Sequence, residues 1–232
     1  MDYVALGIVW YVVFIISTTF HEAAHGFAAA KLGDPTAYHY GLVTVDPLPH
    51  IKSSPFGMVV IPILSFLLSG WMIGWASAPV DPNWAQANRR RAALMSATGP
   101  AANLFLVLAA ALLVRGGMLL GFFHAPQTST FTRVTEAGAL GLANAAAVVI
   151  SILFSLNLIL LVFNLIPLPP LDGSNVLLFF LSDQAAHQYE SFLYQPMHRM
   201  IGLVIAWQFF GPIFDPIHTL ALNILYPGAG YH

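Results

Sequence analysis

The sequence predicts an all-α polytopic membrane protein, and its composition and apolar runs lead to that class. Hydrophobic residues make up 58% of the 232 residues and charged residues only 8%, whereas soluble domains carry about 25% charged residues. The mean hydropathy is +0.74. Several apolar runs reach the length of about 20 residues that a helix needs to cross a bilayer. We therefore expect a single membrane-embedded domain over residues 1–232, surrounded by membrane lipid.

The apolar runs give the order of the expected membrane segments. They fall at residues 4–31, 57–78, 92–120, 138–167 and 199–226, with a shorter run at 174–182. The first, third and fourth runs and the last one are long enough to be transmembrane helices. Together the runs predict about five to six membrane segments, with an irregular element between the first two helices.

The irregular element begins in residues 33–55, where turn-forming residues interrupt the apolar pattern. Asp34-Pro35, Gly41 and Asp46-Pro47 are typical of turns, and the run 40–45 between them is rich in residues that favour strands. We expect a loop with a short strand or hairpin here. Residues 128–135 form a second polar connection, between the third and fourth long runs.

Charge and cysteine content exclude some classes of site. The net charge of −2 gives no basic surface for nucleic acid. The chain has no cysteine, so it has no disulfide framework. Any bound transition metal must be held by histidine and carboxylate side chains.

One motif lies inside the first apolar run. His21, Glu22 and His25 form the pattern His-Glu-x-x-His. Two histidines four residues apart share a helical face and can bind Zn²⁺, while the Glu can act as general base. Ionisable groups inside a lipid-embedded helix cost about 2.5–3.5 kcal/mol each, so they indicate a functional site. The motif predicts a membrane-embedded metallohydrolase with one Zn²⁺ per chain.

A catalytic zinc usually has three protein ligands, so a third is needed. Asp172 follows the proline-rich stretch 167–171, which must interrupt the helix before it. Broken backbone at membrane depth is tolerated where it faces protein or a wet cavity. Asp172 is therefore the favoured ligand. The alternative is a metalloprotease class with a downstream Glu, for which Glu136 and Glu190 are the candidates.

Three motifs together resemble the signature of the site-2 proteases, which are intramembrane zinc metalloproteases. They are His21 to His25, the Gly-Pro-Ala-Ala-Asn sequence at 99–103, and the sequence at 164–173 that ends in Asp-Gly. The segment 74–80 resembles an element of the compact bacterial branch that lacks accessory domains. The resemblance covers about residues 15–180. It implies His21, His25 and Asp172 as zinc ligands, Glu22 as the base, and hydrolysis of peptide bonds within transmembrane protein substrates. It departs from some members in that the His-Glu helix is the first span.

A shared zinc site fixes the expected topology. The end of helix 4–31, the start of helix 92–120 and the end of helix 138–167 must lie on one membrane side. The run 57–78 is then re-entrant, or a helix that returns as an extended segment over 75–84. The basic residues split six to two in favour of the zinc side: Lys31, Lys52, Arg89, Arg90, Arg91 and Arg199 against Arg115 and Arg133. By the positive-inside rule, the site opens toward the cytoplasm. The resemblance to the bacterial branch implies that the membrane is a bacterial inner membrane.

Other residues are expected to support the site. Gly99 and Pro100 either begin a helix or form part of the motif that lies near the metal. Asn103 either bonds between helices or helps to stabilise the oxyanion. Asn164 either satisfies carbonyls freed by the proline break or orients the site. His50 is either a loop histidine or a gating residue.

Substrate entry gives the last group of expected residues. A helix hides its scissile carbonyl, so a substrate must be unwound and held extended, as on a strand edge. Ala76, Ser77 and Ala78 lie in an apolar segment of small residues and are the expected edge, with 40–45 as the second candidate. A different class of function is a non-catalytic zinc-binding membrane protein that binds membrane substrates. The acidic pair Glu22 and Asp172 argues against that class.

Overall fold

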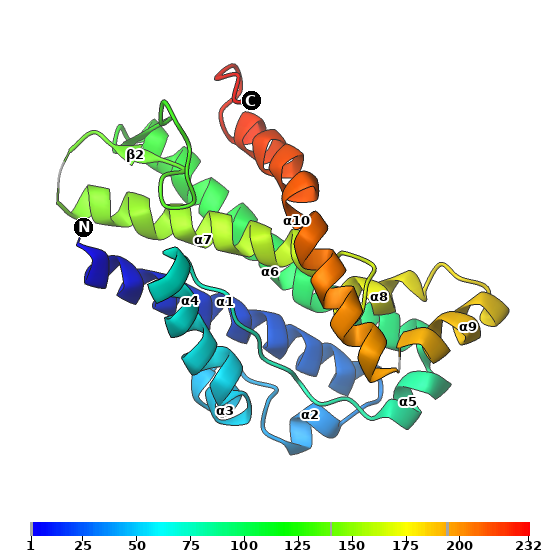
Figure 1. Cartoon of the computed structure of the whole chain (residues 1–232). Coiled ribbons are helices and arrows are strands. Elements are labelled where there is room, and N and C mark those ends of the chain that lie inside the picture. Colours follow the sequence, from blue (N-terminus) through cyan, green and yellow to red (C-terminus); the bar gives the residue numbers. More distant parts are fainter. Residues whose placement is uncertain (1, 140, 194) are drawn as a thin grey trace.

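The structure, a computed structural model, describes residues 2–139, 141–193 and 195–232 (Figure 1). Helices dominate. In chain order the elements are α1 (Tyr3–Leu32), α2 (Thr36–His39), α3 (Pro47–Ser53), the π-helix η1 (Phe56–Val60), α4 (Ile61–Ser69), α5 (Pro82–Ala87), α6 (Arg89–Leu119), β1 (Phe123–His124), β2 (Glu136–Ala137), α7 (Leu142–Asn164), α8 (Asp172–Leu177), α9 (Asp183–Leu193) and α10 (Pro196–Leu225).

Four helices of the described chain are long and apolar enough to cross a membrane, and they match the four expected spans. These are α1, α6, α7 and α10. A fifth span depends on the pair Pro47–Ser53 and Phe56–Ser69, which is bent by 112°. The structure is thus mostly helical with long apolar spans, as predicted. The count of five to six membrane segments stays a prediction.

Helix α1 has defined signals at both ends. The Asp2 side chain accepts a hydrogen bond from the Ala5 backbone N–H at 2.7 Å, which satisfies one of the free donors of the first turn. Gly33 ends the helix with φ of 112°, a conformation that glycine adopts without strain. Thirty residues rise about 45 Å. His21 therefore lies roughly 16 Å from the end of the helix.

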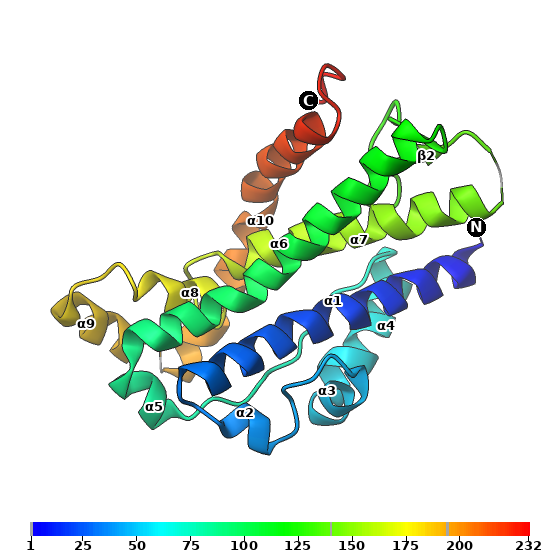
Figure 2. The ribbon, with the colours of Figure 1, turned by 180° about the vertical axis from the view of Figure 1, so that it is seen from behind.

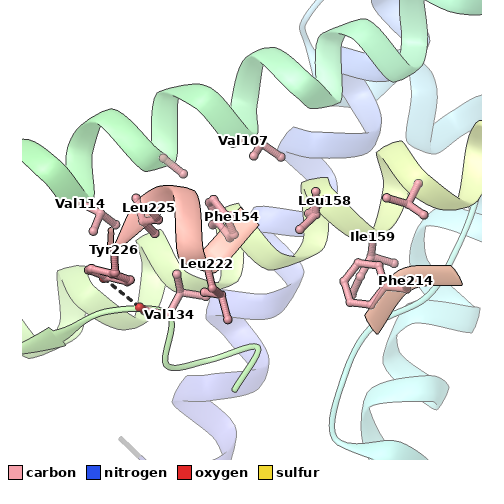
Figure 3. Close-up of a cluster of buried hydrophobic side chains, with 12 residues drawn as sticks. Val107, Val114, Val134, Phe154, Leu158, Ile159, Phe214, Leu222, Leu225 and Tyr226 are labelled. Carbon is pink, nitrogen blue, oxygen red and sulfur yellow. Dashed lines mark hydrogen bonds between the residues drawn. The ribbon is translucent and has the colours of Figure 1, made fainter. Parts of the chain in front are cut away.

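Helices α1, α6 and α7 run side by side in alternating directions, and α10 crosses them at an angle (Figures 1 and 2). The alternation places the end of α1, the start of α6 and the end of α7 together, as the expected zinc site requires. A buried apolar cluster joins the second halves of α6 and α7 to α10 (Figure 3). There the Tyr226 hydroxyl donates to the Val134 carbonyl at 2.9 Å, so the connection between α6 and α7 is fastened to the end of α10.

The chain between α1 and α6 goes out as a helix and returns extended. Helix α4 ends at Ser69 and is capped by Gly70 in the left-handed conformation, with φ of 79°. After a bend, residues 72–81 run to α5 as a drawn-out trace without helix or strand (Figure 1). The Trp75 N–H donates to the Gly57 carbonyl at 3.1 Å. A Cβ on Gly57 would collide with the Trp75 carbonyl oxygen, and a Cβ on Gly74 would collide with the Gly57 carbonyl oxygen. The close approach of the returning chain to η1 therefore needs glycine at both positions. Whether 57–78 is re-entrant or spans and returns stays a prediction.

The predicted strand or hairpin at 40–45 is wrong. These residues form a turn and bends between α2 and α3, with Gly41 at φ of 70°. The Leu42 N–H donates to the Ala37 carbonyl at 2.9 Å, and Leu42 is buried. A strand needs a neighbouring strand to satisfy its backbone, and this segment has none beside it. The sheet in the described chain is instead the short pair β1–β2, on the connection between α6 and α7.

Candidate metal centre

His21 and His25 of α1 turn their ring nitrogens toward a common point. The two Nε2 atoms are 3.0 Å apart. The Asp172 Oδ2 atom lies 3.1 Å from the Nε2 of His21 and 3.3 Å from that of His25. Both histidines are 7% exposed. Among the described residues, these three form the group of His, Asp or Glu side chains that could hold a metal ion.

Asp172 reaches this point because the chain breaks after α7. The helix ends at Asn164, and residues 165–171 turn before α8 begins at Asp172. A Cβ at position 173 would collide with the carbonyl oxygens of Leu165 and Ile166, so Gly173 permits the tight packing of α8 on the end of α7. The sequence therefore encodes a carboxylate at a helix break, and the fold brings it to α1.

Hydrogen bonds to the other ring nitrogens fix which nitrogen of each histidine carries a proton. The Nδ1 of His25 lies 3.0 Å from the Met95 carbonyl oxygen, which can only accept. The Nδ1 of His21 lies 2.6 Å from the Asn103 Oδ1, also an acceptor. Each neutral ring thus holds its proton on Nδ1 and presents a bare lone pair on Nε2.

The three converging atoms fit a metal ion. Two bare nitrogens and a carboxylate oxygen within 3.3 Å repel one another unless a cation lies among them. Tetrahedral zinc with bonds of about 2.0–2.1 Å holds its ligand atoms roughly 3.3 Å apart. The observed separations of 3.0, 3.1 and 3.3 Å are close to that spacing.

Gly99 of α6 packs against the same two nitrogens. A Cβ at position 99 would collide with the His25 Nε2 and lie 2.6 Å from the His21 Nε2. Only glycine leaves room for the ring nitrogens and an ion between the helices. Pro100, the next residue, is buried inside α6 and does not begin the helix, so the helix-start explanation of Gly99-Pro100 is wrong.

Glu22 lies beside the three-atom group and is 6% exposed. One of its carboxylate oxygens, Oε2, accepts a hydrogen bond of 2.7 Å from the Ala78 N–H in the extended segment. The expected edge residues therefore do approach the Glu of the motif. Of the three, Ala78 is the one whose backbone binds it.

A second carboxylate fastens the same segment to the end of α1. Asp34 is 1% exposed. Its Oδ2 accepts from the Asp81 N–H at 2.9 Å, and its Oδ1 accepts from the Thr36 N–H at 3.0 Å and from the Thr36 hydroxyl. Burial opposes the charge, but these hydrogen bonds outweigh it and hold the pKa of Asp34 below its usual value. Residues 78 and 81 are thus both held to acidic side chains, Glu22 in the second half of α1 and Asp34 just after its end.

Residues 9–208 match the profile described as Peptidase family M50. The chain belongs to this family. The resemblance to the site-2 proteases is confirmed at that level.

Three relatives of this M50 chain carry matching descriptions. "Putative zinc metalloprotease YwhC" of Bacillus subtilis (strain 168) is 36% identical over 70% of this chain and 64% of its own length. "Putative zinc metalloprotease Rip2" of Mycolicibacterium smegmatis is 30% identical over 76% of this chain and 59% of its own. The protein of that description in Mycobacterium tuberculosis is 33% identical over 68% and 52%. The matched region spans between half and two thirds of each relative. No solved structure matches the chain.

Other expected residues of this M50 chain make their hydrogen bonds within their own segments. Asn164 donates to the Leu160 carbonyl of its own helix at 3.0 Å. The buried His50 lies 2.9 Å from the Thr44 carbonyl in its own loop, which favours the loop-histidine reading. The alternative ligands are engaged elsewhere. Glu190 pairs with Arg89 at 2.9 Å, and Glu136 lies on β2 at the far end.

Sequence reasoning missed two buried polar residues behind His21. The Asn103 Nδ2 donates to the Asn157 Oδ1 at 2.9 Å, and the Asn157 Nδ2 donates to the Ser17 hydroxyl at 2.9 Å. All three of these residues are 0% exposed. A polar Asn157 in the middle of the apolar run 138–167 was the available signal. Asn103 is fully buried and its amide bonds to both His21 and Asn157, which favours the expected role of bonding between helices.

Proposed function

We propose that this M50 chain is an intramembrane zinc metalloprotease, with His21, His25 and Asp172 as the zinc ligands and Glu22 as the general base. One observation carries the proposal. Three electron-rich atoms converge at the spacing of a zinc ligand set, and a buried carboxylate lies beside them. Membership of family M50 and the descriptions of its relatives support the same activity.

Each residue then has a task in peptide hydrolysis. Zinc, when bound, acidifies a water molecule and polarises the scissile carbonyl. Glu22 accepts the proton of that water and delivers it to the amine that leaves. The Ala78 N–H holds one oxygen of Glu22, which leaves the other oxygen free for the water. Gly99 keeps the space beside the two histidines clear.

The substrates of this reaction are proposed to be transmembrane segments of other membrane proteins. The three-atom group lies on α1 roughly 16 Å from the helix end, which is within the thickness of a bilayer. Six of the eight basic residues lie toward the expected site side. We therefore place the site toward the cytoplasm of a bacterial inner membrane, with 57–78 re-entrant from that side.

The extended segment is the proposed place for the unwound substrate. Residues 75–81 are extended and belong to no sheet. Alternate backbone groups point to opposite sides of an extended chain. Ala78 faces Glu22, so Ser77 turns its backbone the other way and is the group we expect to pair with substrate. Residues 40–45 drop out as the second candidate edge because they form turns.

The decisive experiment compares membrane proteomes of cells that express the wild type, Glu22→Gln, or Glu136→Gln as the matched control. Glu136 lies on β2, far from the metal centre, and carries a partly exposed side chain. The proposal predicts cleaved membrane proteins in the wild type and the control but not in Glu22→Gln, with zinc content equal in all three. Equal proteomes together with full zinc content would favour the non-catalytic zinc-binding protein instead.

A further inference from the structure

A chain of hydrogen bonds runs from His21 through α6 into α7 and back to α1. The His21 Nδ1 meets the Asn103 Oδ1 at 2.6 Å. Asn103 donates to the Asn157 Oδ1 at 2.9 Å. Asn157 in turn donates to the Ser17 hydroxyl at 2.9 Å and to the Leu153 carbonyl at 2.8 Å. The two asparagines and Ser17 are fully buried, so water does not compete for these bonds.

The direction of every bond in this chain follows from its last member. A backbone carbonyl can only accept, so the Asn157 group that faces Leu153 must be its NH₂. The Asn157 oxygen then faces Asn103, which must present its own NH₂ there. That leaves the Asn103 oxygen for His21, whose Nδ1 must carry the proton.

This direction matters because a neutral imidazole has one ring proton. With the proton on Nδ1, the Nε2 of His21 is free to bind a metal. The opposite tautomer would place the proton on Nε2, 3.1 Å from the Asp172 carboxylate, and gain a charge-assisted hydrogen bond there. In the metal-free protein the tautomer with its proton on Nε2 can therefore donate to Asp172. The hydrogen bond from Nδ1 to Asn103 must be stronger than that bond if His21 is to keep its proton on Nδ1.

We infer that Asn157 is a positioning residue that acts through Asn103 to hold His21 in the tautomer that binds zinc. The inference rests on the ligand set of the proposed function. Asn157 touches neither the metal position nor a substrate. It sets the orientation of the Asn103 amide, which on its own could turn over and offer His21 a donor in place of an acceptor.

The test is the variant Asn157→Leu, which keeps the size of the side chain and removes both of its polar groups. The matched control is Ser155→Ala on the same helix, because the buried Ser155 hydroxyl has no hydrogen-bond partner. Metal-free protein labelled with ¹⁵N-histidine is measured in detergent at alkaline pH. The His21 signals are assigned with His21→Ala. We expect the bare nitrogen of His21 to change from Nε2 to Nδ1 in Asn157→Leu and to stay at Nε2 in the control.

The second measurement is the zinc affinity of each variant, determined by competition with a chelator. Loss of a partner behind a metal ligand typically costs about 10–100-fold in affinity, and we expect that loss in Asn157→Leu. If Asn157 acts through Asn103, adding Asn157→Leu to Asn103→Leu weakens zinc by no more than about twofold further. A folded Asn157→Leu variant with the wild-type tautomer and wild-type zinc affinity would overturn the inference. Neither reading uses a substrate, so a protein that binds zinc but cleaves nothing would refute the proposed protease and leave this inference standing.

Discussion

Gly99→Ala is the sharpest single change that the metal centre offers, because it adds one methyl group beside both histidines. The added carbon would lie 2.6 Å from the His21 Nε2 and closer still to the His25 Nε2. Ordinary contacts of such a carbon begin near 3.4 Å. Either α6 must move away by about 1 Å or the two rings must rotate. A metal site tolerates ligand displacements of only about 0.2 Å.

We therefore expect Gly99→Ala to weaken zinc binding by at least about 100-fold. This is the upper end of the loss in metal affinity seen when a residue that supports a metal ligand is mutated. Stability should change little. The crowding costs about 1–3 kcal/mol, and replacing glycine by alanine inside a helix returns about 0.5–1 kcal/mol. The helix should therefore still form, with the metal site lost from it.

The assay is chelator competition for zinc on detergent-purified protein, alongside thermal unfolding of the metal-free form. Gly116→Ala is the matched control, because it lies on the same helix and a Cβ there meets no atom within 4 Å. That variant should bind zinc as the wild type does. Wild-type zinc affinity in Gly99→Ala would refute the geometry on which the proposed ligand set rests.

Four further predictions follow from the same contacts. Asp172→Ala should lose bound zinc by metal analysis, and full retention would remove this carboxylate from the ligand set. Ser77→Pro deletes one backbone N–H of the extended segment, so cleavage should fall at unchanged zinc content; intact cleavage would place the substrate edge elsewhere. Asp34→Asn turns a donor toward the Asp81 N–H and should lower the free energy of unfolding by about 1–3 kcal/mol at pH 7. Because the Asp34 pKa is depressed in the folded state, the difference in free energy of unfolding between wild type and variant should shrink as the pH falls below about 4. A difference that does not change with pH would contradict a charged, hydrogen-bonded Asp34. Single cysteines in place of Arg90 and Thr130 should be labelled from the cytoplasmic and the outer side respectively, and the reverse pattern would overturn the orientation.

The group of three residues that could hold a metal was largely predictable because its members are encoded by local rules. A spacing of four residues puts His21 and His25 on one helical face wherever the helix lies. A run of prolines must break a helix, so Asp172 had to be presented from irregular backbone. Four long apolar runs had to be helices, because a lipid-exposed span must satisfy its backbone internally. The limits of α1 and α6 in the structure lie within a few residues of those expected.

The turn at 40–45 shows where local reasoning failed. Its residues favour strands, but strand propensity expresses packing against neighbouring strands, which this segment lacks. The short pair β1–β2 formed elsewhere, between residues whose own sequence gave little sign of a strand. Strand pairing depends on which segments the fold brings together, and a propensity read along one segment does not contain that information.

The sequence by itself determined the membrane class, the long helices and the residues of the candidate metal centre, because each depends on spacing and polarity along one segment. The tertiary structure alone decided how these residues are held. It set the Ala78 N–H on Glu22, left no room for a side chain at Gly99, and placed Asn157 behind Asn103. The physical reason is that such contacts join segments tens of residues apart, and their hydrogen-bond directions exist only once the helices have packed.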